Sequence, residues 1–219
     1  MQPDGAVRSR GSRLLAGLPE VERQRIASVL EIVDLKQGDT LLVAGEPIPY
    51  VWFPHSCVTS TLVDTPDGRT IEVGIMGLEG VVGLSLVLGL AVSNATVIVQ
   101  IAGRASRMRA AEFVRGIREP RGAAYDAMLR YTDAFLAMVA QTAACNSLHP
   151  IEERLARWML MTHDRIQRNE MPLTQEYVAY MLGVRRASVS IAASALQQRG
   201  LIKYSRGSLM ERLYATPAA

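Results

Sequence analysis

Hydrophobic residues follow a different spacing in successive parts of the chain. From Leu14 to Leu30 they recur at helical intervals, interrupted by Pro19, which predicts one or two short helices. From Ile32 to about residue 110, glycines and turn pairs separate short β-branched runs, a pattern typical of a small antiparallel β-barrel or sandwich. Pro66-Asp67-Gly68 between two such runs predicts a hairpin. The predicted strands are Thr40–Val43, Val51–Phe53, Val58–Val63, Thr70–Ile75, Ala95–Ile101 and Ala105–Arg109.

Helical spacing returns between Arg121 and Asn146, in alternating four- and three-residue steps typical of a coiled-coil seam. A long helix with such a seam between two domains predicts a homodimer interface. The alternative is a helix that packs only on its own barrel. The seam residues are Tyr125, Met128, Thr132, Phe135, Val139 and Thr142.

Leu173 to Leu201 contains two short helical patterns on either side of Gly183. Thr174 is a candidate N-cap for the first helix, and Gly183 suits a left-handed residue at its end. Arg185, Arg186 and two serines lie near the start of the second helix, largely off its apolar stripe. The two stripes consist of Val178, Met181 and Leu182, then of Val189, Ala192, Ala193 and Leu196.

An apolar helix, a glycine turn and a helix with arginine and hydroxyl residues at its start form the helix-turn-helix pattern. The alternative is an ordinary helical hairpin with a solvated arginine pair. Residues 199–208 predict a basic β-wing beside it, with a tight turn at Arg206-Gly207-Ser208. From Pro150 onward the net charge is +4, against −1 for the preceding residues and +3 in total. This C-terminal surplus favours nucleic-acid binding.

Composition places the chain among soluble proteins of a reducing cytoplasm. Residues up to Leu18 lack the apolar core of a secretory signal, and the apolar stretch Val81 to Val92 is too short to span a bilayer. Cys57 and Cys145 lie far apart and form no metal-binding motif. Residues 1–12 are polar and predict a disordered N-terminus.

In this order of elements, the sequence resembles a bacterial Crp/Fnr-type transcription regulator from about Leu14 to Tyr214. The resemblance implies an α+β fold: an N-terminal jelly-roll barrel (double-stranded β-helix) of the cyclic-nucleotide-binding type, a dimerisation helix and a winged helix-turn-helix. The expected boundaries are 13–119 for the sensor barrel, 120–149 for the helix and 150–219 for the DNA-binding domain. The motifs that carry the resemblance are Leu35-Lys36-Gln37-Gly38-Asp39, Val51-Trp52-Phe53-Pro54, Asp67-Gly68-Arg69, Leu173-Thr174-Gln175-Glu176, the stretch Leu182 to Ser190 and the stretch Leu196 to Ile202.

The chain departs from the cyclic-nucleotide-binding members of this family. Those members carry Gly-Glu-Leu and, some ten residues later, Arg-Ser-Ala, which contact ribose and phosphate. Gly83 stands in place of the glutamate and Ser93 in place of the arginine, so we expect neither cAMP nor cGMP to bind. Glu79 stays open as a displaced polar contact. The degenerate effector pocket consists of Gly83, Leu84, Ser85, Ser93, Asn94, Ala95 and Thr96.

Other sensor chemistries of the family find little support in the residues. No cysteine precedes Cys57, which argues against an N-terminal iron–sulfur cluster. His55 and Cys57 would share a face if they lay on one strand, which leaves a haem site as an alternative. A redox thiol at Cys57 or Cys145 is a further alternative to an inert buried cysteine.

The recognition helix departs from the best-known members as well, since Ala187 and Ile191 replace a glutamate and a second arginine. Arg186 is the candidate reader of a guanine edge, with Ala187 against a thymine methyl group. The remaining candidates form two groups. Those expected to contact phosphate or to position the helices are Thr174, Gln175, Arg185, Ser188 and Ser190, and the cations of the wing are Arg199 and Lys203.

We therefore expect a homodimeric, sequence-specific transcription regulator without a cofactor, and not an enzyme. A cupin-type metal enzyme needs several inward histidines, whereas residues 32–110 contain only His55. The alternative function is a barrel that senses a small molecule or haem, with DNA binding dependent on an unknown effector. RNA polymerase would be a further partner of an activator; activation and repression stay open.

Overall fold

The computed structural model describes residues 11–66, 68–166, 168, 170–205 and 208–211. Most of the predicted disordered N-terminus, and residues Asp67, Arg206 and Gly207 of the predicted turns, lie outside this range. Ser12, at the edge of the predicted disordered segment, is buried and caps the first helix through its hydroxyl.

Two antiparallel sheets form the jelly-roll barrel that the sequence predicts, and each predicted strand has a counterpart within two residues of its bounds. The strand Glu31–Leu35 adds an edge to the first sheet. Val51, Phe53 and Val99 are fully buried in the barrel core. The first sheet has the order β1 (Glu31–Leu35), β7 (Gly103–Arg109), β3 (Tyr50–Pro54), and the second the order β2 (Thr40–Leu42), β6 (Thr96–Ile101), β4 (Val58–Asp64), β5 (Thr70–Met76).

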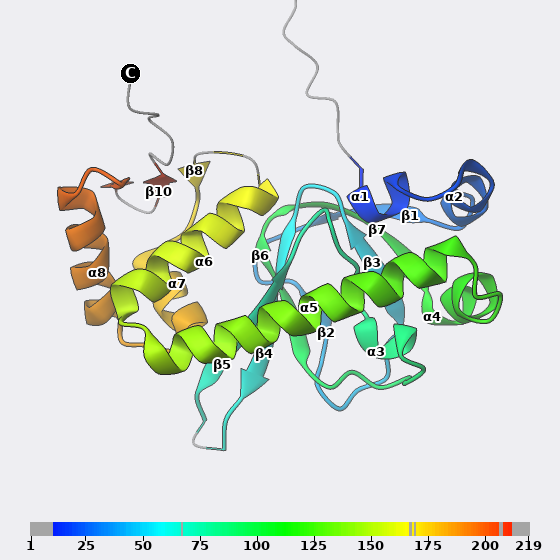
Figure 1. Ribbon diagram of the computed structural model, residues 1–219, viewed down its shortest axis with the longest axis horizontal. Coiled ribbons are helices and arrows are strands. Elements are labelled where there is room, and N and C mark those ends of the chain that lie inside the picture. Colours follow the sequence, from blue (N-terminus) through cyan, green and yellow to red (C-terminus); the bar gives the residue numbers. More distant parts are fainter. Residues whose placement is uncertain (1–10, 67, 167, 169, 206–207, 212–219) are drawn as a thin grey trace, which may run out of the picture.

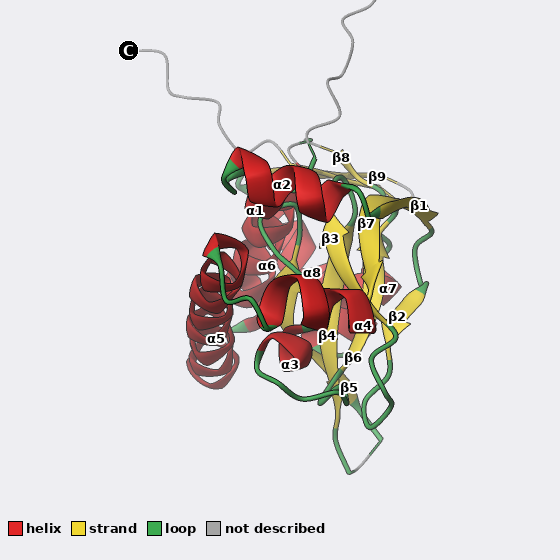
Figure 2. Ribbon diagram, turned by 90° about the vertical axis from the view of Figure 1, so that its right-hand side faces the viewer, coloured by secondary structure: helices red, strands yellow, loops and turns green. Residues whose placement is uncertain are grey.

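Short helices cover one side of the barrel (Figure 2). Pro19 separates the first two, as the sequence predicts. The turn after α4 is a π-helix, Val114–Arg118, which has no counterpart in the sequence prediction. The short helices are α1 (Arg13–Ala16), α2 (Glu20–Ala27), α3 (Leu84–Val87) and α4 (Ala110–Phe113).

Helix α5 (Ala123–Leu148) runs along the barrel to the C-terminal module (Figure 1). Its first two backbone N–H groups, of Ala123 and Ala124, donate to the Glu22 carboxylate of α2 at 2.9 and 2.8 Å. A helix N-terminus leaves such donors unpaired, so Glu22 caps α5 across about a hundred residues of sequence.

The predicted seam of α5 faces the chain's own barrel. Met128 and Thr132 are 0% and 4% exposed, and a Cβ on Gly74 would overlap the ring of Phe135. The stripe therefore marks an intramolecular contact, and its prediction as a dimer interface is wrong for Met128 and Thr132. The other members of the stripe, all partly buried, are Tyr125, Phe135, Val139 and Thr142.

The opposite face of α5 is exposed and apolar. Leu129 is 37% exposed and Leu136 is 59% exposed. Between the two leucines, this face carries one carboxylate, that of Asp133. Toward the end of the helix, small side chains continue the face. The small residues are Ala137, Ala140, Ala143 and Ala144.

The C-terminal module lies at one end of the molecule (Figure 1). It contains two helices joined at Gly183, preceded by a further helix and flanked by a three-stranded sheet of order β8-β10-β9. None of the described helices is long and apolar enough to cross a membrane. The elements are α6 (Ile151–Ile166), β8 (Glu170–Met171), α7 (Gln175–Leu182), α8 (Arg186–Gln198), β9 (Ile202–Ser205) and β10 (Ser208–Glu211).

Candidate nucleic-acid interface and its junction with the barrel

The turn between α7 and α8 has the local geometry that the sequence predicts. The Thr174 hydroxyl accepts a hydrogen bond from the backbone N–H of Tyr177 at 3.1 Å and so caps α7. Gly183 ends α7 in the left-handed region, with φ +63°. A Cβ there would also lie 3.3 Å from the Ile71 side chain of β5. Glycine therefore fixes both the angle between the helices and their approach to the barrel.

The amino end of α8 carries the predicted DNA-contacting arginines on its surface. Arg185 is the N-cap and Arg186 the first helical residue, and both are exposed, as is Ala187. Thr174, Arg185 and Arg186 line one groove, and Ser188 lines the groove beside it. Two guanidinium groups thus lie next to the unpaired backbone donors of a helix start, an arrangement suited to phosphate oxygens.

Two other candidates bind each other. The Ser190 hydroxyl donates to the Gln175 amide oxygen at 2.6 Å, and the backbone N–H of Gln175 donates to the Tyr204 hydroxyl at 3.1 Å. These bonds join the start of α7 to α8 and to strand β9. Gln175 and Ser190 are therefore placed to hold the two helices and the wing in register.

The predicted wing cations differ in their surroundings. Arg199 forms an ion pair with Glu152 of α6 at 2.8 Å, which binds the end of α8 to the same module. Lys203 on β9 is exposed. Of the two, Lys203 is the better placed to meet a phosphate.

The module shares a hydrophobic core with the barrel. Val58, Leu62 and Ile75 of strands β4 and β5 pack with Trp158 of α6 and Val178 of α7 in one buried cluster. A buried polar bond crosses the same boundary, since the Gln100 amide of β6 donates to the Thr162 hydroxyl of α6 at 3.1 Å. Within the barrel, Gln100 accepts from the Ser60 hydroxyl at 2.9 Å. The position of the DNA-binding helices is therefore set by the barrel sheet.

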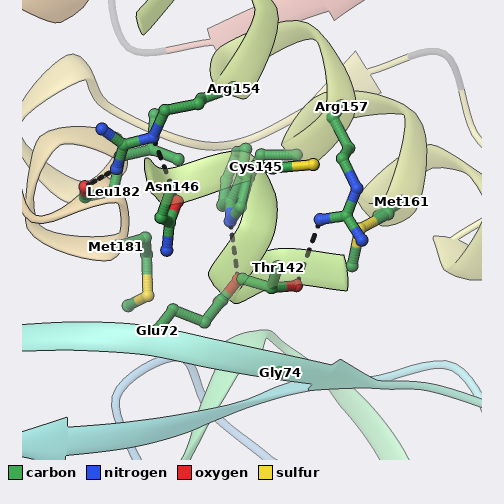
Figure 3. A pocket seen from close by; sticks show the side chains of 11 residues that line it. Glu72, Gly74, Thr142, Cys145, Asn146, Arg154, Arg157, Met161, Met181 and Leu182 are labelled. Carbon is green, nitrogen blue, oxygen red and sulfur yellow. Dashed lines mark hydrogen bonds between the residues drawn. The ribbon is translucent and has the colours of Figure 1, made fainter. Parts of the chain in front are cut away.

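A buried carboxylate lies at the centre of this junction (Figure 3). Glu72 of β5 is 7% exposed and accepts a hydrogen bond from the Trp158 indole N–H at 2.9 Å. Its second oxygen has no hydrogen-bond partner among the described residues. Burial raises the pKa of Glu72 to about 7, and the Trp158 donor and the Arg165 charge offset only part of that effect.

Arg154 connects the end of α5 to the helix-turn-helix (Figure 3). Its guanidinium donates to the Asn146 side chain at 3.0 Å and to the Leu182 carbonyl, next to the Gly183 turn, at 2.6 Å. Arg157 likewise donates to the Thr142 hydroxyl of α5 at 3.1 Å. These side chains and Glu72 enclose a cavity of about 30 Å³, room for about one water molecule.

The sequence alone does not identify Glu72 and Arg154 as junction residues. A glutamate within a strand and an arginine in an amphipathic helix are ordinary surface residues by type. Only the packing of α6 on β5 shows that they are enclosed.

The degenerate effector pocket has no charged group at the two positions where the family places one. Gly83 begins α3 with φ +109°, and a Cβ there would lie 3.3 Å from Val51. Ser93 is 5% exposed, and its hydroxyl donates to the Ala95 carbonyl at 2.7 Å. Glu79 forms an ion pair with Arg165 of α6 at 2.8 Å. The other predicted members lie on α3 and at the start of β6: Leu84 and buried Ser85 on α3, exposed Asn94 and buried Ala95 just before β6, and Thr96 at its first position, whose hydroxyl accepts from the Ala44 backbone N–H.

The histidine and cysteine of the haem alternative do not share a strand face. Both lie in the turn between β3 and β4, where the His55 ring and the Ser106 hydroxyl form a hydrogen bond at 2.9 Å. Burial, and to a smaller extent the Arg104 charge, lowers the pKa of His55. Burial raises the pKa of the Cys57 thiol to about 12, which keeps it protonated and unreactive. The condition for a shared face is not met, because β3 ends at Pro54 and neither residue lies on a strand.

Comparison with known proteins bears on the C-terminal module and on the whole fold separately. Residues 153–213 match the family model described as the Crp-like helix-turn-helix domain. No curated protein matches the chain.

Solved structures of Crp/Fnr regulators share the fold along most of the chain. FixK2 from Bradyrhizobium japonicum has a TM-score of 0.71 at 16% identity, over 84% of this chain and 93% of its own. The regulator CLP from Xanthomonas campestris, described as c-di-GMP-responsive, has a TM-score of 0.70 at 12% identity, over 88% and 99%. The CRP-family regulator TTHB099 from Thermus thermophilus has a TM-score of 0.66 at 17% identity, over 82% and 91%.

At these identities the likeness is one of fold, and the domain match adds the character of the C-terminal module. The chain therefore contains a Crp-like helix-turn-helix domain, and its jelly-roll barrel, long helix and C-terminal module together have the fold of the solved Crp/Fnr regulators.

Proposed function

We propose that this protein is a cytoplasmic transcription regulator, not an enzyme, that binds an inverted-repeat DNA operator as a homodimer. The observation that carries the proposal is the exposed amino end of α8, with Arg185 and Arg186 beside the capped start of α7. In a helix-turn-helix, this end of the second helix contacts base edges in the major groove. Arg186 then reads a guanine edge, while Thr174, Arg185 and Ser188 hold phosphates.

Dimerisation uses the exposed face of α5. Leu129, Leu136 and the alanines toward the end of the helix form an apolar stripe that a second copy would cover. A twofold axis along this stripe pairs identical surfaces and places one recognition helix in each half-site, about one helical turn of DNA apart.

Specific DNA binding does not require cAMP in this proposal. Gly83 offers no carboxylate for ribose hydroxyls, and the buried Ser93 offers no cation for phosphate. The Ser93 hydroxyl is already bonded within its own loop. The ligand-free protein is therefore expected to bind its operator, and cAMP is expected to leave that affinity unchanged.

Arg186→Ala should lower affinity for the operator by about 1–3 kcal/mol per half-site, roughly 5- to 150-fold for each, because a bidentate contact to one guanine is lost in each half. The same change should remove the preference at one base pair of each half-site. Lys203→Ala should instead weaken binding to all sequences about equally and reduce the salt dependence by about one phosphate contact per protomer. Fluorescence anisotropy on operator and single-base variants, at several salt concentrations, measures both effects.

Lys36→Ala is a matched control, because it removes an exposed cation on the barrel. It should bind as the parent does. If Arg186→Ala keeps both the affinity and the base preference of the parent, Arg186 does not read the operator.

A further inference from the structure

The exposed face of α8 carries an apolar pair that its packing does not use. Val189, Ala192, Ala193 and Leu196 are buried, each 2% or 3% exposed. Ile191 is 72% exposed and lies one turn after the exposed Ala187. At 3.6 residues per turn, both side chains point away from the buried stripe.

This pair lies on the surface proposed to enter the major groove. Arg186 precedes Ala187 on the same end of the helix, and the contacts of α8 with α6, α7 and β9 are on its other side. In Figure 1 α8 lies at the edge of the molecule, away from the barrel. The Ser190 hydroxyl between them is bonded to Gln175, so it does not compete for the same position.

The chemistry of the pair selects its partner in the groove. An aliphatic side chain can neither donate nor accept a hydrogen bond, and the apolar group on major-groove base edges is the 5-methyl of thymine. Cytosine at the same place would present an amino group that Ile191 leaves unpaired, which costs binding energy. We propose that Ile191, together with Ala187, reads thymine methyl groups, so that each half-site carries thymine beside the guanine read by Arg186. This inference rests on the proposed function and names the bases that the same surface recognises.

Removal of single methyl groups from the DNA tests the contact. The duplex is the inverted repeat that the protein selects from a random pool, and each thymine is replaced by deoxyuridine in turn. Base pairing is unchanged, so the affinity difference reports the methyl alone. At the thymine facing Ile191, the parent protein should lose about fourfold per methyl, the value expected for one buried carbon. Ile191→Ala should bind the thymine and uracil duplexes about equally at that position.

Ser194→Ala serves as a control, because it alters another exposed position of α8 and should keep the parent's response to uracil. Ile191 is exposed, so its truncation leaves the core of the module intact, which circular dichroism verifies. A half-site without thymine, no uracil effect at any thymine, or an unchanged uracil effect in Ile191→Ala would each overturn the inference while specific binding remains. Absence of specific binding by the parent would instead overturn the proposed function.

Discussion

Leu136→Asp is expected to convert the proposed dimer into a monomer and to lower operator affinity on the order of 100-fold or more, because two linked recognition helices bind far more tightly than one. Leu136 is 59% exposed at the middle of α5, on the face opposite the barrel. A carboxylate there would be buried against its own twofold copy, which costs the desolvation of two like charges. Sedimentation velocity measures the oligomeric state, and anisotropy on the operator measures the affinity.

Val21→Asp provides the matched control, because Val21 is 80% exposed on α2 and is not part of the exposed face of α5. It should leave both the dimer and its affinity as in the parent. A Leu136→Asp protein that still sediments as a dimer would show that the exposed face of α5 is not the interface.

Glu72 should make the protein less stable as pH rises from 4.5 to 7. Its pKa is raised by burial from 4.5 to about 7, so the folded protein holds a proton that the unfolded chain releases. The stability that this provides is fully present below pH 4.5 and is lost as pH rises through 7, by about 3 kcal/mol at 1.36 kcal/mol per pKa unit. Glu72→Gln should remove that slope and raise stability above pH 7, because an amide oxygen can still accept from Trp158.

Urea unfolding at several pH values measures this difference between parent and variant. Glu46→Gln, which neutralises an exposed carboxylate on the barrel, should keep the slope of the parent. If Glu72→Gln shows the same loss of stability between pH 4.5 and 7 as the parent, the Glu72 carboxyl does not cause it.

Local features could be predicted where the residues that produce them lie within the same short stretch of sequence. Thr174 caps α7 and Gly183 turns the chain because a hydroxyl acceptor and a left-handed backbone act within a few residues. The strands were found for the same reason, since glycine and turn residues bound each β-branched run.

Features that depend on distant partners could not be predicted. The spacing of apolar residues on α5 predicts an apolar contact surface. It does not show which face of the helix packs on the barrel, because both faces carry apolar or small residues. The Gly74 position decides which stripe packs inward, because it leaves room for the Phe135 ring. The Glu22 cap of α5 likewise depends on a contact across about a hundred residues.

The candidate DNA-contacting residues lie together on one module, but the contacts of each within that module required the fold. Arg185, Arg186 and Ala187 are exposed, whereas Gln175 and Ser190 bind each other and Arg199 binds Glu152. No sequence signal separates an arginine that meets solvent from one held by a neighbouring helix. Glu72 was missed for the same reason.

The central claim is most directly tested by selection of the ligand-free protein against a pool of random duplexes at near-physiological salt. The enriched DNA should be an inverted repeat whose half-site centres lie about one helical turn apart. Failure to enrich any sequence, or enrichment of a site without twofold symmetry, would contradict it.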